Sequence, residues 1–187
     1  MSITKSNVIT KNYRGKLGNQ IVFRNRNGAS IMAIPPKKSA TGPTENQINA
    51  RRRFMLASRY AKMVLQDPDM LEAYAAKAVN GAAPYILAMT DYLKPPFVQE
   101  IDTTGYHGNP GDKISVIAGD DFKLTGVLVK ISDPDGIVIE QGVCVLNTLN
   151  GNQDYTATMS APAPEGFTIT AIATDTPGHT AELSVTL

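Results

Sequence analysis

Apolar and polar residues alternate around an Asn-Gly pair within residues 21–34. Asn27-Gly28 favours a two-residue type I′ turn, which predicts a β-hairpin in which Phe23 pairs with Met32. Successive side chains of a strand point to opposite faces, so one face of this hairpin is apolar. Because an isolated hairpin is only marginally stable in water, this face needs a covering surface; we predict that it binds a partner, with the helices that follow in the chain as the alternative. The residues of the face are Ile21, Phe23, Met32 and Ile34.

The next segment has a helical period. Apolar residues recur at steps of three and four, which predicts helices over residues 44–66, 68–79 and 84–93, the last ended by Pro95-Pro96. The apolar stripe of the first helix consists of Ala50, Phe54, Ala57, Ala61 and Val64. Tyrosines and methionines of the other two helices are predicted to form a core, with a partner-binding surface as the alternative. These residues are Met70, Tyr74, Tyr85, Met89 and Tyr92.

After residue 96 the period changes from helical to alternating. Short strands separated by turns rich in Gly, Pro and Asn are typical of an all-β sandwich. The predicted strands are residues 98–102, 113–118, 123–132, 136–146, 154–160, 166–174 and 181–187. The prediction is therefore an α+β chain of two domains. Residues 1–96 would hold an extended basic arm (1–19), the β-hairpin and the three-helix module, and residues 97–187 would form the sandwich.

The net charge of +1 is unevenly distributed. Residues 1–62 contain 13 Lys and Arg and one acid, Glu45, which gives +12, whereas residues 63–187 contain 5 Lys and 16 acids, which gives −11. This asymmetry predicts that the N-terminal part docks on an anionic partner, with a solvated helix and hairpin face as the alternative. The cations predicted to bind the partner are Arg24, Arg26, Lys37, Lys38, Arg51, Arg52, Arg53, Arg59 and Lys62.

Nucleic acid is a less favoured partner than protein for these cations. Few aromatic residues accompany them, and Phe23 and Phe54 belong to predicted apolar faces, which leaves few platforms for base stacking. The Gly15-Lys-Leu-Gly18 segment lacks the spacer and the Lys-Ser/Thr ending of a phosphate-binding loop. We therefore predict no nucleotide site.

Residues suited to metal binding or catalysis are sparse. The chain has two histidines, His107 and His179, and one cysteine, Cys144, whereas zinc needs three or four well-spaced ligands. The sequence thus predicts no metal, no cofactor and no enzymatic activity. Cys144 lies in an apolar run and is expected to be buried. Weak calcium binding by loop carboxylates is an alternative, through Asp120, Asp121 and Asp175.

Two segments of the C-terminal half carry a family resemblance. Residues Gly166 to Gly178 form an alternating strand followed by Asp175 and a Gly turn, and residues 127–142 form a second strand pair around a turn. Both resemble hairpins of bacterial immunoglobulin-like (Ig-like) domains, although His179 stands where that family usually has Asn. The resemblance implies an Ig-like sandwich over about the last 80 residues and implies little about function.

The N-terminal half carries a second resemblance. Its residues are Gly15-Lys-Leu-Gly18, Asn27-Gly28, Pro35-Pro36 and Thr44-x-x-Gln47 with Arg51 and Phe54. This pattern resembles small uncharacterised proteins of Bacteroidota and their phages, which often pair the module with an Ig-like C-terminal domain. Ig-like domains are also common on phage virions. The resemblance therefore implies a virion or accessory assembly role.

These observations together predict a structural protein, an auxiliary or decoration protein of a phage virion. Its partner would be a capsid or other virion protein, or neighbouring copies of the chain. A nucleic-acid-binding accessory protein and a surface adhesin-like module are the alternatives. The sequence shows no apolar run of membrane-spanning length and no secretory signal, so we expect location in the virion after assembly in the bacterial cytoplasm, without membrane contact.

Overall fold

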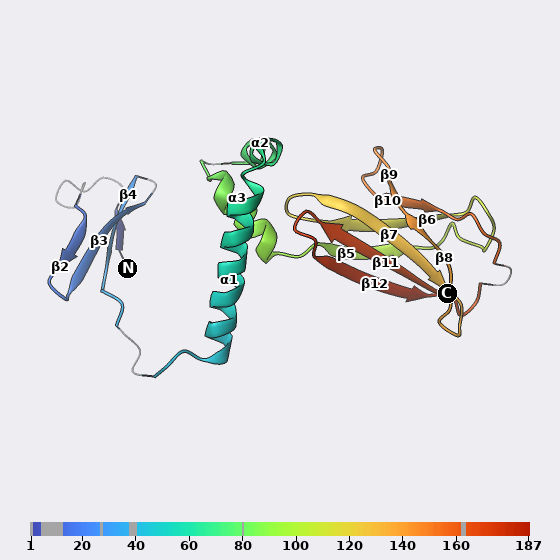
Figure 1. Ribbon diagram of the computed structural model, residues 1–187, viewed down its shortest axis with the longest axis horizontal. Coiled ribbons are helices and arrows are strands. Elements are labelled where there is room, and N and C mark those ends of the chain that lie inside the picture. The colour runs from blue at the N-terminus through green and yellow to red at the C-terminus, as the bar shows by residue number, and fades with distance from the viewer. Residues whose placement is uncertain (1, 5–12, 27, 38–40, 80, 162–163) are drawn as a thin grey trace. The chain divides into compact units, whose positions relative to one another are not determined.

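The computed structural model describes residues 2–4, 13–26, 28–37, 41–79, 81–161 and 164–187. Over these residues the chain has an α+β fold with three helices and three antiparallel sheets (Figure 1). The chain divides into two compact units, residues 1–45 and residues 46–187.

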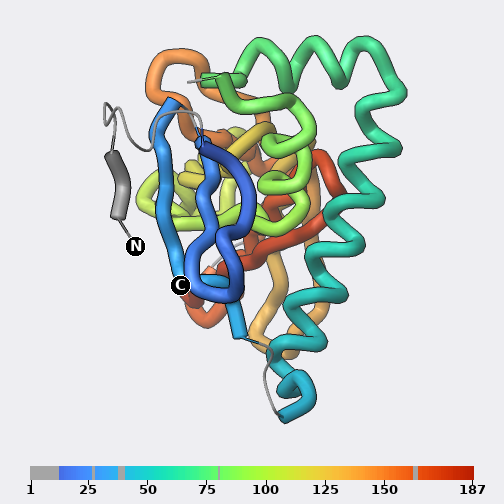
Figure 2. Tube along the Cα trace, turned by 90° about the vertical axis from the view of Figure 1, so that its left-hand side faces the viewer, coloured from blue at the N-terminus to red at the C-terminus, as the bar shows by residue number. Residues whose placement is uncertain are grey.

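The N-terminal unit is a four-stranded antiparallel sheet with the strand order β1-β4-β3-β2. Its strands are β1 (Ser2–Thr4), β2 (Gly15–Leu17), β3 (Ile21–Arg26) and β4 (Ala29–Ala33). β3 and β4 lie side by side in the blue part of the trace (Figure 2). Arg26 pairs with Ala29 and Phe23 with Met32, so the predicted hairpin is confirmed.

The segment predicted as an extended arm contains the other two strands. β2 pairs with β3, with Leu17 opposite Ile21, and a turn at Gly18 connects them. Gly18 has a φ of 55°, a left-handed conformation that glycine adopts at little cost, which accounts for the second glycine of the Gly-Lys-Leu-Gly segment. The prediction of an arm over residues 1–19 is therefore wrong where β1 and β2 lie, while residues 5–12 are outside the described part of the chain.

No described side chain of the N-terminal unit is buried. The unit contains one sheet, and among its described residues no helix or second sheet covers either face. Apolar burial has to offset the entropy of ordering the chain, and the described side chains of this sheet supply little of it. The described part of the unit therefore has no buried core of its own.

Three helices follow: α1 (Glu45–Val64), α2 (Pro68–Ala76) and α3 (Pro84–Leu93). These bounds confirm the predicted helices to within three residues. Asp67 caps α2, because its carboxylate accepts a hydrogen bond of 3.0 Å from the backbone N–H of Asp69. Pro68 follows the cap, at a position where a helix needs no N–H donor.

The helices enclose a small core that includes one residue, Phe122, from the loop between β6 and β7. The rings of Tyr74 and Phe122 stack with their centroids 3.9 Å apart. Met70, Tyr85 and Tyr92 pack against this core, which confirms the core role predicted for the tyrosines and methionines. The buried members of the core are Ala57, Ala61, Tyr74, Ala88, Met89 and Phe122.

The division of the chain differs from the domain boundary predicted between residues 96 and 97. The helices group with the sheets because Phe122 fills the helical core and because the Lys77 ammonium donates a hydrogen bond to the Phe122 carbonyl oxygen. Pro95-Pro96 marks a change of hydrophobic period but not a change of compact unit. A periodicity pattern does not show which helix packs on which sheet.

Residues 97–187 form two four-stranded antiparallel sheets, ordered β5-β6-β10-β9 and β12-β11-β7-β8 (Figure 1). Buried residues from both sheets make one core, with Ile114 and Val116 from one sheet and Val129 and Ile169 from the other. Each predicted strand region contains a strand. The strands are β5 (Phe97–Asp102), β6 (Lys113–Gly119), β7 (Leu124–Ser132), β8 (Val138–Val143), β9 (Val145–Leu146), β10 (Gln153–Thr156), β11 (Thr168–Asp175) and β12 (Thr180–Thr186).

The strand predicted over residues 136–146 is in fact two strands in different sheets. β8 pairs with β7 and β9 pairs with β10, and the chain crosses between the sheets at Cys144. The N–H of Cys144 donates a 2.8 Å hydrogen bond to the Val127 carbonyl oxygen. The prediction of one continuous strand is wrong, because alternation of apolar and polar residues does not show where the chain passes from one sheet to the other. Cys144 is buried as predicted, and this burial raises the pKa of its thiol to about 12.

Candidate docking surfaces

The first candidate surface is the apolar face of the N-terminal sheet. Phe23 lies opposite Met32, and Leu17 lies opposite Ile21, so these four side chains share one face. Ile34 follows β4 and is 79% exposed. Ile21 and Phe23 are partly buried, and Met32 is exposed. The sheet thus brings Ile21, Phe23 and Met32 together, and none of them is fully buried by the described residues of the unit.

The opposite face of the N-terminal sheet carries cations beside small apolar patches. Lys16 pairs with Val22, and Arg24 pairs with Ile31. Lys16, Arg24 and Arg26 are all exposed. The N-terminal sheet therefore has one apolar face and one positively charged face.

The second candidate surface is the first half of α1. Every residue from 45 to 56 is exposed, including Phe54 at 59%. The predicted apolar stripe is therefore covered only in part, because Ala57 and Ala61 are buried whereas Ala50 is exposed. The reason is length: α1 has 20 residues, while α2 has nine and α3 has ten, so they cover only the second half of α1. The first turns of α1 extend beyond α3 (Figure 1).

The predicted cations are spread over β3, the segment after β4 and the whole length of α1. Arg53 donates a hydrogen bond of 3.1 Å to the Leu93 carbonyl oxygen, so it also holds α1 against α3. Among the described residues, none of the predicted cations forms an ion pair with a carboxylate. Lys38 lies outside the described residues. The exposed members of the set are Arg24, Arg26, Lys37, Arg51, Arg52, Arg53, Arg59 and Lys62. Their role in binding stays a prediction.

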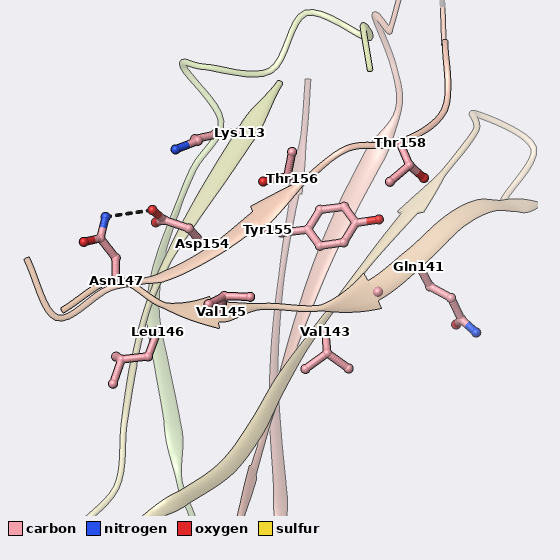
Figure 3. A pocket seen from close by; sticks show the side chains of 11 residues that line it. Lys113, Gln141, Val143, Val145, Leu146, Asn147, Asp154, Tyr155, Thr156 and Thr158 are labelled. Atoms are coloured by element: carbon pink, nitrogen blue, oxygen red, sulfur yellow. Dashed lines mark hydrogen bonds between the residues drawn. The ribbon is translucent and has the colours of Figure 1, made fainter. Parts of the chain in front are cut away.

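The third candidate surface is a groove of about 610 Å³ where the edges of the two sheets meet. Figure 3 shows Gln141 and Val143 of β8, Val145 and Leu146 of β9, and Tyr155 of β10 around it. Three of these five side chains are aliphatic and one is aromatic. The sequence does not predict this groove, because β8 and β9, which both line it, were predicted as one strand.

One end of the groove is polar. Asn147 donates a hydrogen bond of 2.8 Å to Asp154, drawn as a dashed line in Figure 3. Asp154 also accepts a 2.8 Å hydrogen bond from Ser115. Lys113 lies at the same end, so the groove holds one cation and one carboxylate. The groove is thus close to electrically neutral within an acidic unit.

Gly142 allows the Tyr155 ring to lie against β8. A Cβ atom at Gly142 would lie 2.6 Å from Cε2 of Tyr155. The ring cannot move aside freely, because it is buried and its hydroxyl donates a 2.7 Å hydrogen bond to Glu140. We therefore expect Gly142→Ala to lower the free energy of unfolding by about 1–3 kcal/mol, measured by urea denaturation.

Gly126→Ala is the matched control for this substitution. Gly126 lies in the neighbouring strand β7, and nothing approaches within 4 Å of the Cβ position there. We expect the control to change stability by about 0.5 kcal/mol or less. Equal losses in the two variants would show that the contact with Tyr155 is not the cause.

A buried polar cluster joins the helices to the loops of the sheets. Asp91 of α3 is 2% exposed, and its Oδ2 accepts a 2.5 Å hydrogen bond from the Tyr74 hydroxyl. The Tyr74 hydroxyl also lies 3.1 Å from that of Tyr60. Oδ1 of Asp91 and Oδ1 of Asp120 are both buried and accept no hydrogen bond from the described residues. Two carboxyl oxygens therefore lack a donor in this cluster.

The surroundings of Asp91 disfavour its negative charge. Burial raises the pKa of Asp91 most, and the Tyr74 hydrogen bond opposes this rise. The negative charges of Asp120 and Asp175 and the contact with the Asp120 carboxyl raise it further, to about 6. Asp175 is itself buried and accepts hydrogen bonds from the backbone N–H of His179 at 2.6 Å and pairs with its ring Nδ1 at 3.0 Å. These acids bring negative charges from the helices and from the sheet loops close together, and this creates a pH dependence.

His179 and Tyr92 line a small hollow of about 260 Å³ beside α1. Their rings meet edge to face with centroids 4.9 Å apart. Arg53 and Leu56 of α1 form the other side of the hollow. This contact holds the β11–β12 turn against α3.

The sequence contains one signal for the buried cluster. Asp91 is the one charged residue of α3, in the otherwise apolar segment Pro84–Leu93. A lone carboxylate in an apolar helix is expected to be buried and hydrogen-bonded. Within the described part of the chain, no group of three or more His, Cys, Asp or Glu residues is arranged to hold a metal ion, including the three loop acids considered for calcium. None of the described helices has the length and apolarity needed to cross a membrane.

Comparisons with known proteins do not identify this chain. No protein-family model matches it. No curated protein matches it either. Among solved structures, the crystal structure of CopC from Methylosinus trichosporium OB3b is similar over 48% of this chain and 87% of its own, with 12% sequence identity and a TM-score of 0.34.

Proposed function

We propose that this chain is a structural assembly protein that docks its N-terminal sheet and the exposed half of α1 on an acidic protein surface. The observation that carries the proposal is a four-stranded sheet with an apolar face and no buried side chain among its described residues. Such a sheet gains stability when a partner covers the apolar face. The exposed apolar and cationic residues of α1, among them Phe54 and Arg52, offer a separate surface of the same chemical character.

Charge favours an acidic partner, and the chain itself contains one. Residues 1–45 carry eight Lys and Arg and one Glu, a net charge of +7, whereas residues 46–187 carry ten Lys and Arg and 16 acids, a net charge of −6. A basic unit on one copy therefore complements the acidic unit of the next. Such charges raise the rate of association and set its orientation more than they raise affinity. A capsid or other virion protein is the second partner class, from the N-terminal resemblance.

We further propose that the two-sheet part is an Ig-like domain displayed by the docked unit. The strand orders β5-β6-β10-β9 and β12-β11-β7-β8 support this assignment. They correspond to the ABED sheet and the GFC sheet with an added C′ strand of an immunoglobulin sandwich. This assignment describes the fold only. The proposed function rests on the docking surfaces and not on the Ig-like fold.

The test is the oligomeric state of the full chain at low and high salt. We expect association at about 50 mM salt that weakens strongly at about 500 mM, because screening shortens the range of the charges. Arg24→Glu together with Arg26→Glu is expected to abolish the low-salt association in sedimentation velocity. Lys123→Glu is the control, since Lys123 is an exposed cation of the acidic unit.

Two results would contradict docking between copies. One is a monomer at both salt concentrations, and the other is equal association by the double variant and the parent. Duplex DNA in the same experiment tests the rival function, a nucleic-acid-binding accessory protein. The exposed Tyr13 and Phe54 near Arg24 and Arg52 in sequence would supply its aromatic contacts. A salt-sensitive shift of DNA that the double variant loses would favour that function.

A further inference from the structure

The two sheets of residues 97–187 differ in how their edge strands are protected. β5 carries exposed Glu100 and Asp102, and β12 carries exposed Glu182. Exposed charges on an edge strand prevent pairing with the edge of another molecule. β8 and β9, the edge strands on the other side, carry no exposed charge from residue 138 to residue 146. This side of the domain therefore lacks the usual protection.

The one charged residue on this edge is turned inward. Glu140 of β8 is buried and accepts hydrogen bonds from the Tyr155 hydroxyl at 2.7 Å and the Thr158 hydroxyl at 2.7 Å. The backbone N–H groups of Thr158, at 2.6 Å, and Met159, at 3.3 Å, also donate to it. Burial favours the neutral form of Glu140, but these hydrogen bonds outweigh it and the pKa of Glu140 is lowered. The Glu140 carboxylate therefore makes its hydrogen bonds inside the domain and places no charge on the exposed edge.

The side chains that remain on the edge are apolar. Val143 is 67% exposed and Val145 is 73% exposed, and Val138 and Leu146 are also exposed. β8 is the last strand of its sheet, so its backbone groups on the side away from β7 have no strand partner among the described residues. An uncharged apolar edge with free backbone hydrogen-bonding groups is a template for another strand.

We propose that β8 of one copy pairs antiparallel with β8 of a second copy, so that the β12-β11-β7-β8 sheet continues across a twofold axis. A twofold axis places identical segments opposite each other, so a self-pairing edge must not carry exposed charge. Residues 46–187 carry a net charge of −6, and two copies therefore repel each other over most of this unit. The uncharged edge at Val138–Val143 is where that repulsion is weakest. This inference uses a different surface from the docking proposal and does not rest on it.

The test is sedimentation equilibrium of the full chain at about 500 mM salt, where association steered by charge is screened. We expect a monomer–dimer equilibrium with a dissociation constant in the micromolar range, because six paired residues make a small interface. Val143→Lys places a cation on the edge and is expected to weaken the dimer by about tenfold or more. Val79→Lys is the matched control, because Val79 is 73% exposed and lies outside the sheets, between α2 and α3.

Hydrogen exchange gives a second measurement that does not depend on a variant. We expect amides of Val138–Val143 to exchange more slowly as protein concentration rises, while those of Thr180–Thr186 on the opposite edge do not change. The inference is overturned by a monomer at all concentrations in high salt, by a dimer that Val143→Lys and Val79→Lys affect equally, or by protection of the β12 edge instead. The Arg24→Glu and Arg26→Glu variant separates the two proposals, since it alters association at low salt only.

Discussion

Phe122→Ala is expected to release the three helices from the sheets and to cost about 3–5 kcal/mol of stability. Phe122 belongs to the loop between β6 and β7, yet its buried ring stacks on Tyr74 inside the helical core. The Lys77 ammonium lies 5.0 Å from the ring centroid and bonds the carbonyl oxygen of the same residue. Loss of the ring leaves a cavity in a core that has six buried residues.

Hydrogen exchange with mass spectrometry measures this release. In the Phe122→Ala variant we expect faster exchange in α1, α2 and α3 and little change in β7 and β11, whose core lies between the two sheets. Circular dichroism at the helical minimum should show a separate, earlier thermal transition. Phe54→Ala is the matched control, since Phe54 is a largely exposed phenylalanine on α1 and its loss should change stability by about 0.5 kcal/mol or less. A single transition that moves as a whole would contradict separate release of the helices.

Asp91→Asn is expected to stabilise the protein near neutral pH by up to about 3 kcal/mol. The pKa of Asp91 is about 6 in the folded chain, against an ordinary value of 3.8. The folded state therefore holds a proton that the unfolded state has lost, so the contribution of Asp91 to stability falls as pH rises from about 4 to about 6 and stays low above that. An asparagine carries no charge, its carbonyl accepts the Tyr74 hydrogen bond, and its amide group offers a donor to Asp120.

The measurement is the free energy of unfolding in urea near pH 4 and near pH 7. We expect the variant to lose the part of the pH dependence that lies between these values, and to differ little from the parent at the acidic end. Asp135→Asn is the control, since Asp135 is exposed in the β7–β8 turn. A variant with the same pH dependence as the parent would show that ionisation of Asp91 does not lower the stability of the folded state.

Local signals in the sequence predict much of the fold. The pairing of Arg26 with Ala29 matches the register that the Asn27-Gly28 motif predicts, and the helical period with Asp67-Pro68 predicts the position of α2. Each of these features depends on residues close together in the chain. The strand regions of the C-terminal half follow from alternation and turns for the same reason.

The features that the sequence did not predict depend on contacts between distant segments. Phe122 is 48 positions from Tyr74, so its place in the helical core is not visible as a period. The change of sheet at Cys144 is set by a hydrogen bond to Val127 and not by a break in alternation. The exposed half of α1 follows from the shortness of α2 and α3, which a stripe of apolar residues does not reveal. The candidate surfaces were therefore predicted at the hairpin and missed at the groove.

The crossing at Cys144 limits how far the two sheets can move apart on the side of β8 and β9. One residue separates β8 from β9, and two Cα–Cα steps span at most about 7 Å. This short connection keeps the two sheets at a fixed separation at that point, even when a ligand binds in the adjacent groove. A strand from another molecule must therefore pair along the outer edge of β8. It cannot insert between the two sheets, because the connection at Cys144 does not let them separate.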